Sequence, residues 1–411
     1  MTTLRVLLHV AAQRDYKLHS LDFSTAFLQG SLHEEIWLRR PPGFTGSFPA
    51  GTQWSLRWSV YGLRQAPRES HDMLRTTLAA LGFAPSTADP SLFLCTDTSL
   101  PPFYVLVYID DLVFAIADIE QSWLADHPGQ SSAHHYPDSV THSSPGPSAL
   151  RFQFSSPQPT PLSTSHSLSA PPLDESVEPS GLYPELVGCL MYMMTFTRPD
   201  LAYLLSLLAR YVAPGRHRKV HWDTGKRLLR YLCSMSSMGL VLGGRGPVVL
   251  TIHADASWVD DSSTQRSSQG YTFSLGCGSL SWRSTCSSSV LSSNCEAEIY
   301  AGAMAAKELH WLTYLLTGLG EQPRSHPNLY VDNKAMIALC QEHRLEHRTK
   351  HIALRYFLDR ELQQRGLLRL AYVATRANTA DIFTKALPPG DHQRFSTVLG
   401  LVPTLPHLLT A

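Results

Sequence analysis

Hydrophobic residues along the chain alternate between helical and strand-like spacing. Residues 4–12, LRVLLHVAA, have the period of a helix, and residues 183–240 return to that spacing. Residues 103–117, FYVLVYIDDLVFAIA, are two apolar runs around a pair of acids, which predicts a β-hairpin. From about residue 126 to residue 180 the chain is rich in Ser, Pro and His without a sustained period, so we predict a loop or linker there.

Residues 247–390 alternate between strand and helix patterns. The apolar runs predict five strands, VVLTIHADAS, GYTFSLG, SLSWRS, NLYVD and LLRLAYV. A long helix, EAEIYAGAMAAKELHWLTYLL, separates the third strand from the fourth, two helical stretches separate the fourth from the fifth, and a closing helix, NTADIFTKAL, follows. Strands that come first, followed by helices and two more strands, indicate a mixed sheet covered by helices. We therefore predict an α+β or α/β fold class with a mixed five-stranded sheet and flanking helices.

Length and composition bound the fold and the partners. The 411 residues suit two or three domains, and a hydrophobic fraction of 43% is enough to build a core. Lys plus Arg and Asp plus Glu number 34 each, so any nucleic-acid site must be a local patch of charge. The seven cysteines are never spaced CxxC, which disfavours a disulfide framework or structural zinc and favours a reducing compartment. The most apolar stretch is interrupted by Arg198, Pro199 and Asp200, so we expect a soluble chain with no membrane partner.

Three acids lie where apolar runs end or turn. Asp22 follows an apolar run in LHSLDFSTAF, and Asp110 and Asp111 occupy the tip of the predicted hairpin. Adjacent carboxylates between two apolar strands are costly unless something neutralises them. A pair of divalent cations would do so and would support in-line phosphoryl transfer. A solvated turn is the alternative interpretation of an acid pair taken alone.

A second group of acids lies in the strand–helix alternation. Asp255 falls in the first predicted strand, Asp332 ends the strand NLYVD, and Asp381 opens the predicted closing helix. Glu298 lies at the start of the long helix, but Glu296 points to a different helix face, and the apolar pattern does not decide which of the two lines the site. Strand ends and helix starts converge on one edge of such a sheet, so four carboxylates can share two metal ions.

Three blocks of the N-terminal third carry a family resemblance. In order, LDFSTAFLQGSLHEEIWLRRPPGF, VYGLRQAPRES and YVLVYIDDLVF resemble the palm of a Copia-type (Pseudoviridae) retrotransposon reverse transcriptase, and the block beginning YPELVGCLMYMM resembles the segment after the polymerase. The resemblance implies a ferredoxin-like palm in which Asp22, Asp110 and Asp111 bind the metal ions. It also implies that Phe27 excludes a ribose 2′-hydroxyl and that Gln65 lines the nucleotide pocket. Ordinary core packing is the alternative role for Phe27.

The chain departs from this family in three ways. It starts shortly before the first motif, so we expect the basic fingers segment to be absent. Between about residues 118 and 151 the Ser/Pro/His-rich run replaces the stretch that would supply the primer grip and thumb, and Ser70 stands where the family usually has Trp. Polymerisation needs a clamped primer end and a held triphosphate. We therefore expect RNA-directed DNA polymerase activity to be impaired or absent.

Residues 244–390 resemble the RNase H domain attached to Copia-type reverse transcriptases. The resemblance rests on HADASWVDD, RSSQGYTFSLG, SLSWRST, VLSSNCEAEIYAGAMAAKELHWL, YVDNKAMIAL, EHRTKHIALRYFLDREL and ATRANTADIFTKAL. It implies that two Mg²⁺ ions, or Mn²⁺ in their place, are held by four carboxylates: Asp255, Glu298, Asp332 and Asp381. The implied reaction is hydrolysis of the RNA strand of an RNA–DNA hybrid.

The segment EHRLEHRTKHIALRYFLDR contains a cluster of basic residues that is our candidate contact for the nucleic-acid backbone. Its members are Arg344, Arg348, Lys350 and Arg355. A solvated helix face is the alternative interpretation of such a charge run. Three histidines recur there every four residues, but without a nearby cysteine or an HExxH arrangement they favour phosphate contact or helix packing over zinc.

The sequence thus predicts five segments and supports one leading hypothesis for the function of the whole chain. They are a truncated palm (1–118), a divergent linker (119–180), a helical connection (181–243), an RNase H-like domain (244–390) and a C-terminal tail (391–411). The leading hypothesis is a retrotransposon-derived Pol fragment that acts as a ribonuclease H with a defective polymerase. We expect it to engage an RNA–DNA hybrid, an RNA template, a DNA primer and other Pol polyprotein segments, in the cytoplasm, in virus-like particles or in the nucleus. The alternative is a catalytically dead remnant that at most binds nucleic acid.

Overall fold

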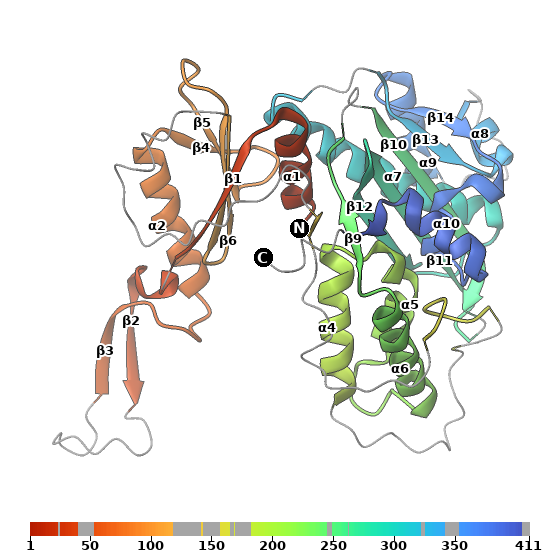
Figure 1. Ribbon diagram of the computed structural model, residues 1–411, viewed down its shortest axis with the longest axis horizontal. Coiled ribbons are helices and arrows are strands. Elements are labelled where there is room, and N and C mark those ends of the chain that lie inside the picture. Colours follow the sequence, from red (N-terminus) through yellow and green to blue (C-terminus); the bar gives the residue numbers. More distant parts are fainter. Residues whose placement is uncertain are drawn as a thin grey trace. The chain divides into compact units, whose positions relative to one another are not determined.

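The chain is divided into two compact units (Figure 1). The smaller unit is Arg14–Asp138, and the larger unit combines Met1–Gln13 with Ser139–Ala411. The computed structural model describes residues 1–23, 25–39, 53–117, 141–142, 157–164, 168, 182–244, 249–261, 263–321, 325–341 and 353–404.

The smaller unit is built on an antiparallel sheet of five strands in the order β1-β7-β6-β5-β4. The strands are β1 (Lys17–Asp22), β4 (Phe83–Pro85), β5 (Leu92–Cys95), β6 (Phe103–Tyr108) and β7 (Asp111–Ile116). Leu74 and Leu78 of helix α2 (Ala66–Ala80) pack against aromatic and aliphatic residues of β4, β6 and β7. The predicted hairpin at 103–117 is confirmed as β6 and β7, which are joined by the two-residue turn Ile109–Asp110.

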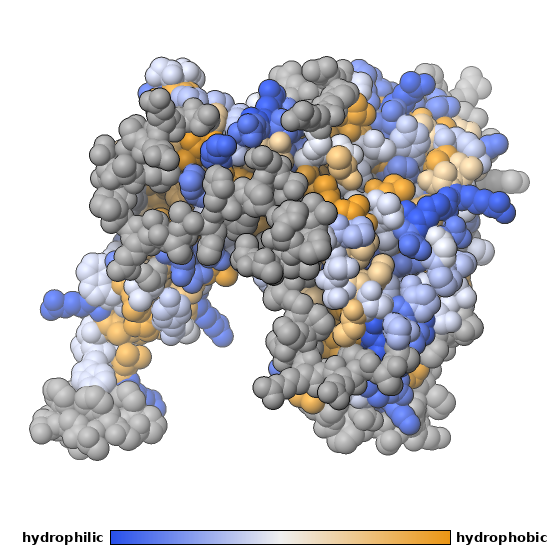
Figure 2. All heavy atoms as spheres, in the orientation of Figure 1, coloured by the Kyte–Doolittle hydropathy of each residue, from blue (hydrophilic) through white to orange (hydrophobic). Residues whose placement is uncertain are grey.

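A two-stranded ribbon forms a separate sheet in this unit. It consists of β2 (Ser31–Arg39) and β3 (Gln53–Trp58) and follows the 3-10 helix η1 (Ala26–Leu28). Its register places Ile36, Leu38, Trp54 and Leu56 on one face. Figure 2 shows hydrophobic side chains at the surface of this ribbon, where Leu38 is exposed. The opposite face carries mostly polar residues, so the ribbon is amphipathic.

The larger unit contains a mixed sheet of five strands in the order β12-β11-β10-β13-β14. The strands are β10 (Leu250–Asp261), β11 (Arg266–Leu275), β12 (Gly278–Cys286), β13 (Asn328–Val331) and β14 (Arg369–Tyr372). The first three pair antiparallel, whereas β13 pairs parallel with both β10 and β14. The predicted mixed five-stranded sheet is confirmed.

Three helices, of which the longest contacts the sheet directly, complete this layer. They are α7 (Asn294–Gly318), α8 (Lys334–Gln341) and α9 (Ala353–Gln364). Helix α7 begins where the Ser293 side chain accepts a hydrogen bond from the N–H of Glu296 (3.2 Å). It ends at Gly318, and two residues later the positive φ of Gly320 (+75°) lets the N–H of Glu321 donate to the carbonyl of Leu316 (2.8 Å). Local capping therefore fixes both ends of the helix that carries the candidate glutamates.

Asp359 of α9 is a fully buried acid at the contact with α7. Neither of its carboxylate oxygens has a hydrogen-bond partner among the described residues. A methyl group added at Gly302 of α7 would lie 2.9 Å from its Oδ2, so the two helices are in close contact here. Burial raises the pKa of Asp359 well above its ordinary value, because an apolar environment disfavours the charged form.

Asp359→Leu is expected to raise the free energy of unfolding at pH 7 by about 1–3 kcal/mol, because it removes a buried polar group without a partner. The pKa of Asp359 is higher in the folded protein than in the unfolded chain. Its contribution to the free energy of unfolding is therefore fully present below pH ~4 and is lost as the pH rises through the folded pKa. Asp359→Asn should remove that pH dependence. Denaturant titrations of the three proteins between pH 4 and 8 check this, and parallel pH profiles for wild type and Asp359→Asn would contradict it.

The segment that lies in the sequence between the sheet of the smaller unit and the five-stranded sheet of the larger unit is mainly helical, as the spacing of its apolar residues predicts. Its elements are α4 (Leu182–Phe196), η3 (Pro199–Leu201), α5 (Ala202–Leu208), η4 (Ala209–Tyr211), α6 (Lys219–Ser234) and the strand β9 (Met238–Val241). These helices share one hydrophobic cluster. Although this is the most apolar part of the sequence, no helix in the described ranges has the length and apolar character needed to span a bilayer.

Helix α1 (Thr2–Arg14) packs within the larger unit, although the sequence analysis places it in the palm segment 1–118. The Arg5 guanidinium lies 3.9 Å from the centre of the Trp282 ring, and its Nε donates to the carbonyl of Leu280 (2.6 Å). Burial lowers the pKa of Arg5 to about 9. The spacing of apolar residues predicts the helix itself, but Leu280, which accepts the Arg5 hydrogen bond, lies 275 residues away, so no local pattern indicates this contact.

The C-terminal region differs from its prediction in two respects. The predicted closing helix NTADIFTKAL is instead the 3-10 helix η7 (Thr379–Phe383), since Pro388 and Pro389 follow too closely for a long α-helix to continue. The predicted tail 391–411 contains most of helix α10 (Pro389–Val398) and the strand β15 (Leu401–Pro403), which pairs with β9. Proline at the first helical position and buried apolar residues such as Phe395 explain why this segment forms regular structure.

Part of the predicted linker 119–180 packs against the connection helices. Leu162 is buried in their hydrophobic cluster. Arg227 donates from Nη2 to the carbonyl of Thr160 (3.3 Å). Most of the linker lies outside the described residues, but the short segment 157–164 has no helix or strand and is nevertheless attached.

Candidate active site

Two of the candidate acids are aligned by neighbouring parallel strands. In the β10–β13 ladder, His253 lies opposite Tyr330. Asp255 and Asp332 each follow two residues later, so their carboxylates emerge from the sheet at the same level. Asp255 is buried in the middle of β10, whereas Asp332 lies just after the end of β13.

Asp381 reaches these two acids from η7. The Asn378 side chain accepts a hydrogen bond from the N–H of Ala380 (3.2 Å) and donates to the carbonyl of Ala254 (3.0 Å), which ties η7 to β10 beside Asp255. A methyl group at Gly270 of β11 would lie 2.4 Å from the Cβ of Phe383, so the approach of η7 to the sheet requires glycine there.

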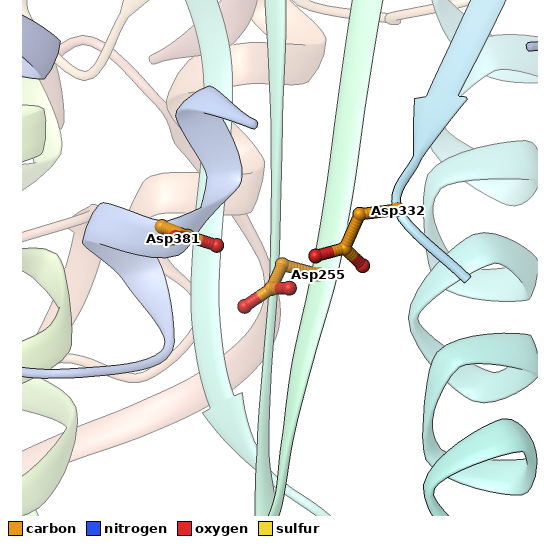
Figure 3. Close-up of side chains that lie close together, drawn as sticks. All are labelled: Asp255, Asp332 and Asp381. Atoms are coloured by element: carbon orange, nitrogen blue, oxygen red, sulfur yellow. The ribbon is translucent and has the colours of Figure 1, made fainter. Parts of the chain in front are cut away.

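The three aspartates converge on one point (Figure 3). One carboxylate oxygen from each of Asp255, Asp332 and Asp381 lies within 4.8 Å of the others. Within the described part of the chain this is the one group of three or more His, Cys, Asp or Glu residues with ligand atoms so close. Asp255 and Asp332 line a cleft of ≈ 490 Å³ that is also lined by Glu298, Lys385 and Tyr372.

The two glutamates of α7 have different surroundings. Glu298 is buried, lines the cleft and interacts electrostatically with Asp255 and Asp332, while its Oε2 has no hydrogen-bond partner among the described residues. Glu296 instead accepts hydrogen bonds at Oε2 from the N–H and the hydroxyl of Ser292, both at 2.7 Å. The structure therefore places Glu298 at the site and Glu296 at the start of the helix.

The site holds more negative charge than its surroundings stabilise. Burial raises the pKa of Asp255, and burial with the charges of Asp255 and Asp332 raises the pKa of Glu298 well above its usual range. Burial and the charge of Asp255 raise the pKa of Asp381 to about 7. Full ionisation of such a group needs a cation nearby.

Two neighbours that the sequence analysis did not single out supply partial compensation. The hydroxyl of Thr384 donates to Asp255 Oδ2. Lys385 Nζ lies 2.9 Å from Asp381 Oδ1 and 3.9 Å from Asp255 Oδ2. Burial alone would lower the pKa of Lys385, but the charges of these two aspartates more than reverse this and raise it. Both residues lie in the motif ATRANTADIFTKAL, and their place three and four residues after Asp381 is the signal that could have found them.

The donor set fits a hard divalent cation. All candidate ligand atoms are carboxylate oxygens, which suit Mg²⁺ and Mn²⁺, and histidine and cysteine are absent from the three-aspartate group. The orphaned Oε2 of Glu298 offers a further buried oxygen on the same cleft. The residues present therefore fit the metal site that the sequence predicts.

The palm carboxylates also lie near one another. Asp22 at the end of β1 pairs in register with Asp111, and the carbonyl of Asp110 accepts a hydrogen bond from the N–H of Phe23 (2.7 Å). Burial, followed by the charges of Asp110 and Asp22, raises the pKa of Asp111. Ile109 has φ +61°, which is unusual for a β-branched residue and strains the turn that carries the acid pair.

The two predicted nucleotide-pocket residues lie in η1 and directly before α2. Phe27 of η1 is partly buried and contacts Tyr61 edge to face at 5.0 Å, and Gln65 is partly buried directly before α2. The buried hydroxyl of Ser70 donates to the carbonyl of Ala26 (3.0 Å) and so ties α2 to η1. These contacts give Phe27 a packing role, and its role toward a ribose stays a prediction.

The predicted nucleic-acid contacts fall outside the described residues. Arg344, Arg348 and Lys350 lie in the segment 342–352, which the description does not cover. Arg355 belongs to α9, but its side chain is not among those described. Their role stays a prediction.

A family model and two relatives that align over most of the chain point to the same group of proteins. Residues 1–126 match the family model described as reverse transcriptase (RNA-dependent DNA polymerase). The chain is 33% identical over 98% of its length to the Retrovirus-related Pol polyprotein from transposon RE2 of Arabidopsis thaliana, and 30% identical over 98% to that from transposon TNT 1-94 of Nicotiana tabacum. It covers 29% and 32% of these relatives, so it spans about a third of their length.

Among solved structures, one that the chain matches is the foamy viral protease-reverse transcriptase in complex with RNA/DNA hybrid. The match has a TM-score of 0.46 and 12% sequence identity, and it covers 90% of this chain and 45% of that one.

Proposed function

Because this chain belongs to the Pol polyproteins of Copia-type retrotransposons, with a reverse transcriptase segment and an RNase H-like segment, we propose that it hydrolyses the RNA strand of RNA–DNA hybrids. The observation that carries the proposal is the convergence of ligand oxygens from Asp255, Asp332 and Asp381 within 4.8 Å of one another, at a cleft that Asp255 and Asp332 line. Three such carboxylates repel one another, which the fold tolerates at a site that holds divalent cations.

The residues of the cleft have distinct roles in this reaction. Asp255, Asp332 and Asp381, with Glu298, would hold two Mg²⁺ ions, which when bound polarise a phosphoryl oxygen and favour attack by water. Thr384 fixes one oxygen of Asp255, and Asn378 fixes η7, so the carboxylates keep their orientation before substrate binds. The cleft is open, which suits a long, rigid duplex.

We also propose that the palm no longer extends primers efficiently. Its three carboxylates lie near one another but do not form a group of ligand atoms as close as that of the larger unit. The competing hypothesis for the whole chain is a remnant without catalysis that at most binds nucleic acid. A labelled RNA–DNA hybrid assay with Mg²⁺, and with EDTA to remove it, separates the two functions.

In that assay Glu298→Gln is expected to lower the rate of cleavage by about 100-fold or more, since even outer-shell partners of metal ligands cost about 10–100-fold when lost. Glu296→Gln is the matched control, because it changes an acid on the same helix that bonds Ser292. It should retain the wild-type rate within a few-fold and instead lower the melting temperature slightly. Equal losses in the two variants would contradict the assignment of Glu298.

A further inference from the structure

Lys385 is the described cation closest to the acidic cluster. Its Nζ lies 2.9 Å from Asp381 Oδ1 and 3.9 Å from Asp255 Oδ2. Among the described residues, Lys385 is the one basic side chain that forms an ion pair with either acid. The two carboxylates are 7% and 4% exposed, whereas the Lys385 side chain is 35% exposed. The ammonium group therefore reaches from the solvent side of the cleft into a buried acid pair.

We propose that Lys385 is a positioning residue. Its ammonium group holds Asp255 and Asp381 in their converging orientation when the site contains no metal, and it moves away from the two acids when a divalent cation binds. The identity of that cation rests on the proposed function. The role of Lys385 in the metal-free protein rests on the ion pairs alone.

The charges of the site require a counter-ion in the metal-free state. Two carboxylates a few ångströms apart repel each other, and the repulsion is stronger in a partly buried site than in water. The Thr384 hydroxyl contributes a hydrogen bond to Asp255 but no charge. A lysine suits a temporary role, because its compact charge sits on a flexible stem that can move toward solvent.

Lys334 provides a matched comparison in the same cleft. Its side chain also lines the cleft, but its Nζ lies over the ring of Tyr372 at 4.7 Å, and no ion pair joins it to the acids in the described structure. Removing its charge therefore changes the general electrostatics of the cleft without removing a direct partner of Asp255 or Asp381.

The test measures Mg²⁺ binding and thermal melting of the full chain without nucleic acid. Isothermal titration calorimetry gives the Mg²⁺ affinity, and melting in EDTA gives the stability of the metal-free protein. The proteins compared are wild type, Lys385→Met, Lys385→Arg and the control Lys334→Met. If Lys385→Met does not fold, Lys385→Gln takes its place.

Lys385→Met is expected to bind Mg²⁺ about five-fold tighter or more, because the competing positive charge is gone. In EDTA it should melt about 3 °C or more below wild type, because the acids lose their counter-ion. Lys385→Arg should restore both values toward wild type, and Lys334→Met should change either one by less than half as much.

Two results would overturn the proposal: a Lys385→Met protein that matches Lys334→Met in both measurements, or a Lys385→Arg protein that restores neither. The outcome is separable from that of the proposed function. Wild-type protein that binds Mg²⁺ without cleaving hybrids would end the nuclease proposal only. If wild type bound no Mg²⁺, the nuclease proposal would lose its cation, and the melting comparison in EDTA would still decide the role of Lys385.

Discussion

Asp255→Asn is expected to reduce cleavage of the RNA strand in a labelled RNA–DNA hybrid by about a thousand-fold or more. Asp255 is the centre of the acidic cluster, since its carboxylate lies beside Asp332 and Asp381 and contacts Thr384 and Lys385. An amide of the same shape carries no charge for a cation. Because loss of an outer-shell partner alone costs about 10–100-fold, loss of the ligand itself should cost more.

This prediction includes its own control for folding. Burial and the charge of Asp332 raise the pKa of Asp255, so the ionised carboxylate destabilises the metal-free protein near neutral pH. Asp255→Asn should therefore melt in EDTA at or above the wild-type temperature, and a loss of cleavage could not be attributed to unfolding. If the variant cleaved as fast as wild type, or if both stayed at the background rate, the ribonuclease proposal would have to be abandoned in favour of the inactive remnant.

The sheet and the acids of the larger unit could be predicted from the sequence because their determinants are local. The apolar runs around Asp255 and before Asp332 define buried strands, and parallel pairing of β10 with β13 brings the two acids to the same level. The sequence predicts the strands themselves, and the register that pairs His253 with Tyr330 sets the common level of the two acids. The same holds for the hairpin that carries Asp110 and Asp111.

Other features depend on contacts that no local pattern encodes. The choice between Glu296 and Glu298 rests on the hydrogen bonds of Ser292, which belong to the geometry of the helix start. The attachment of α1 to the larger unit rests on Arg5 meeting Trp282 far along the chain. The strand β15 pairs with β9, which lies far from it in the sequence, whereas the three residues Leu401–Pro403 alone give only a weak strand signal.

A buried ion pair in the connection helices gives the largest expected effect on stability. Arg198 donates from Nε and Nη2 to the two carboxylate oxygens of Asp200, at 2.9 and 2.6 Å, and the hydroxyl of Tyr231 donates to Asp200 Oδ2 (2.6 Å). Both side chains are at most 4% exposed. Burial alone would raise the pKa of Asp200, but the charge and hydrogen bonds of Arg198 more than offset it and hold that pKa below its ordinary value.

Asp200→Ala is expected to lower the free energy of unfolding of the larger unit by about 3–5 kcal/mol, because it leaves the Arg198 guanidinium buried without a counter-charge. Asp223→Ala is the matched control. Its carboxylate pairs with Lys226 at 2.6 Å on α6, but both partners are partly exposed, so the loss should stay below about 1 kcal/mol. Denaturant titration at pH 7 measures both variants.

The pH dependence of the same pair separates the lost charge from lost packing. Since the folded pKa of Asp200 is depressed, its stabilising contribution is present above its unfolded pKa of ~3.9 and is lost as the pH falls through the folded value. The difference in stability between wild type and Asp200→Ala should therefore shrink in acid. The double variant Arg198→Met with Asp200→Leu removes both charges and should recover much of the loss, because neither charge is then buried alone. If the double variant is no more stable than Asp200→Ala, the unpaired charge does not cause the loss of stability. The lost contacts of Arg198 and Asp200 with Tyr231 and the surrounding cluster would then account for it.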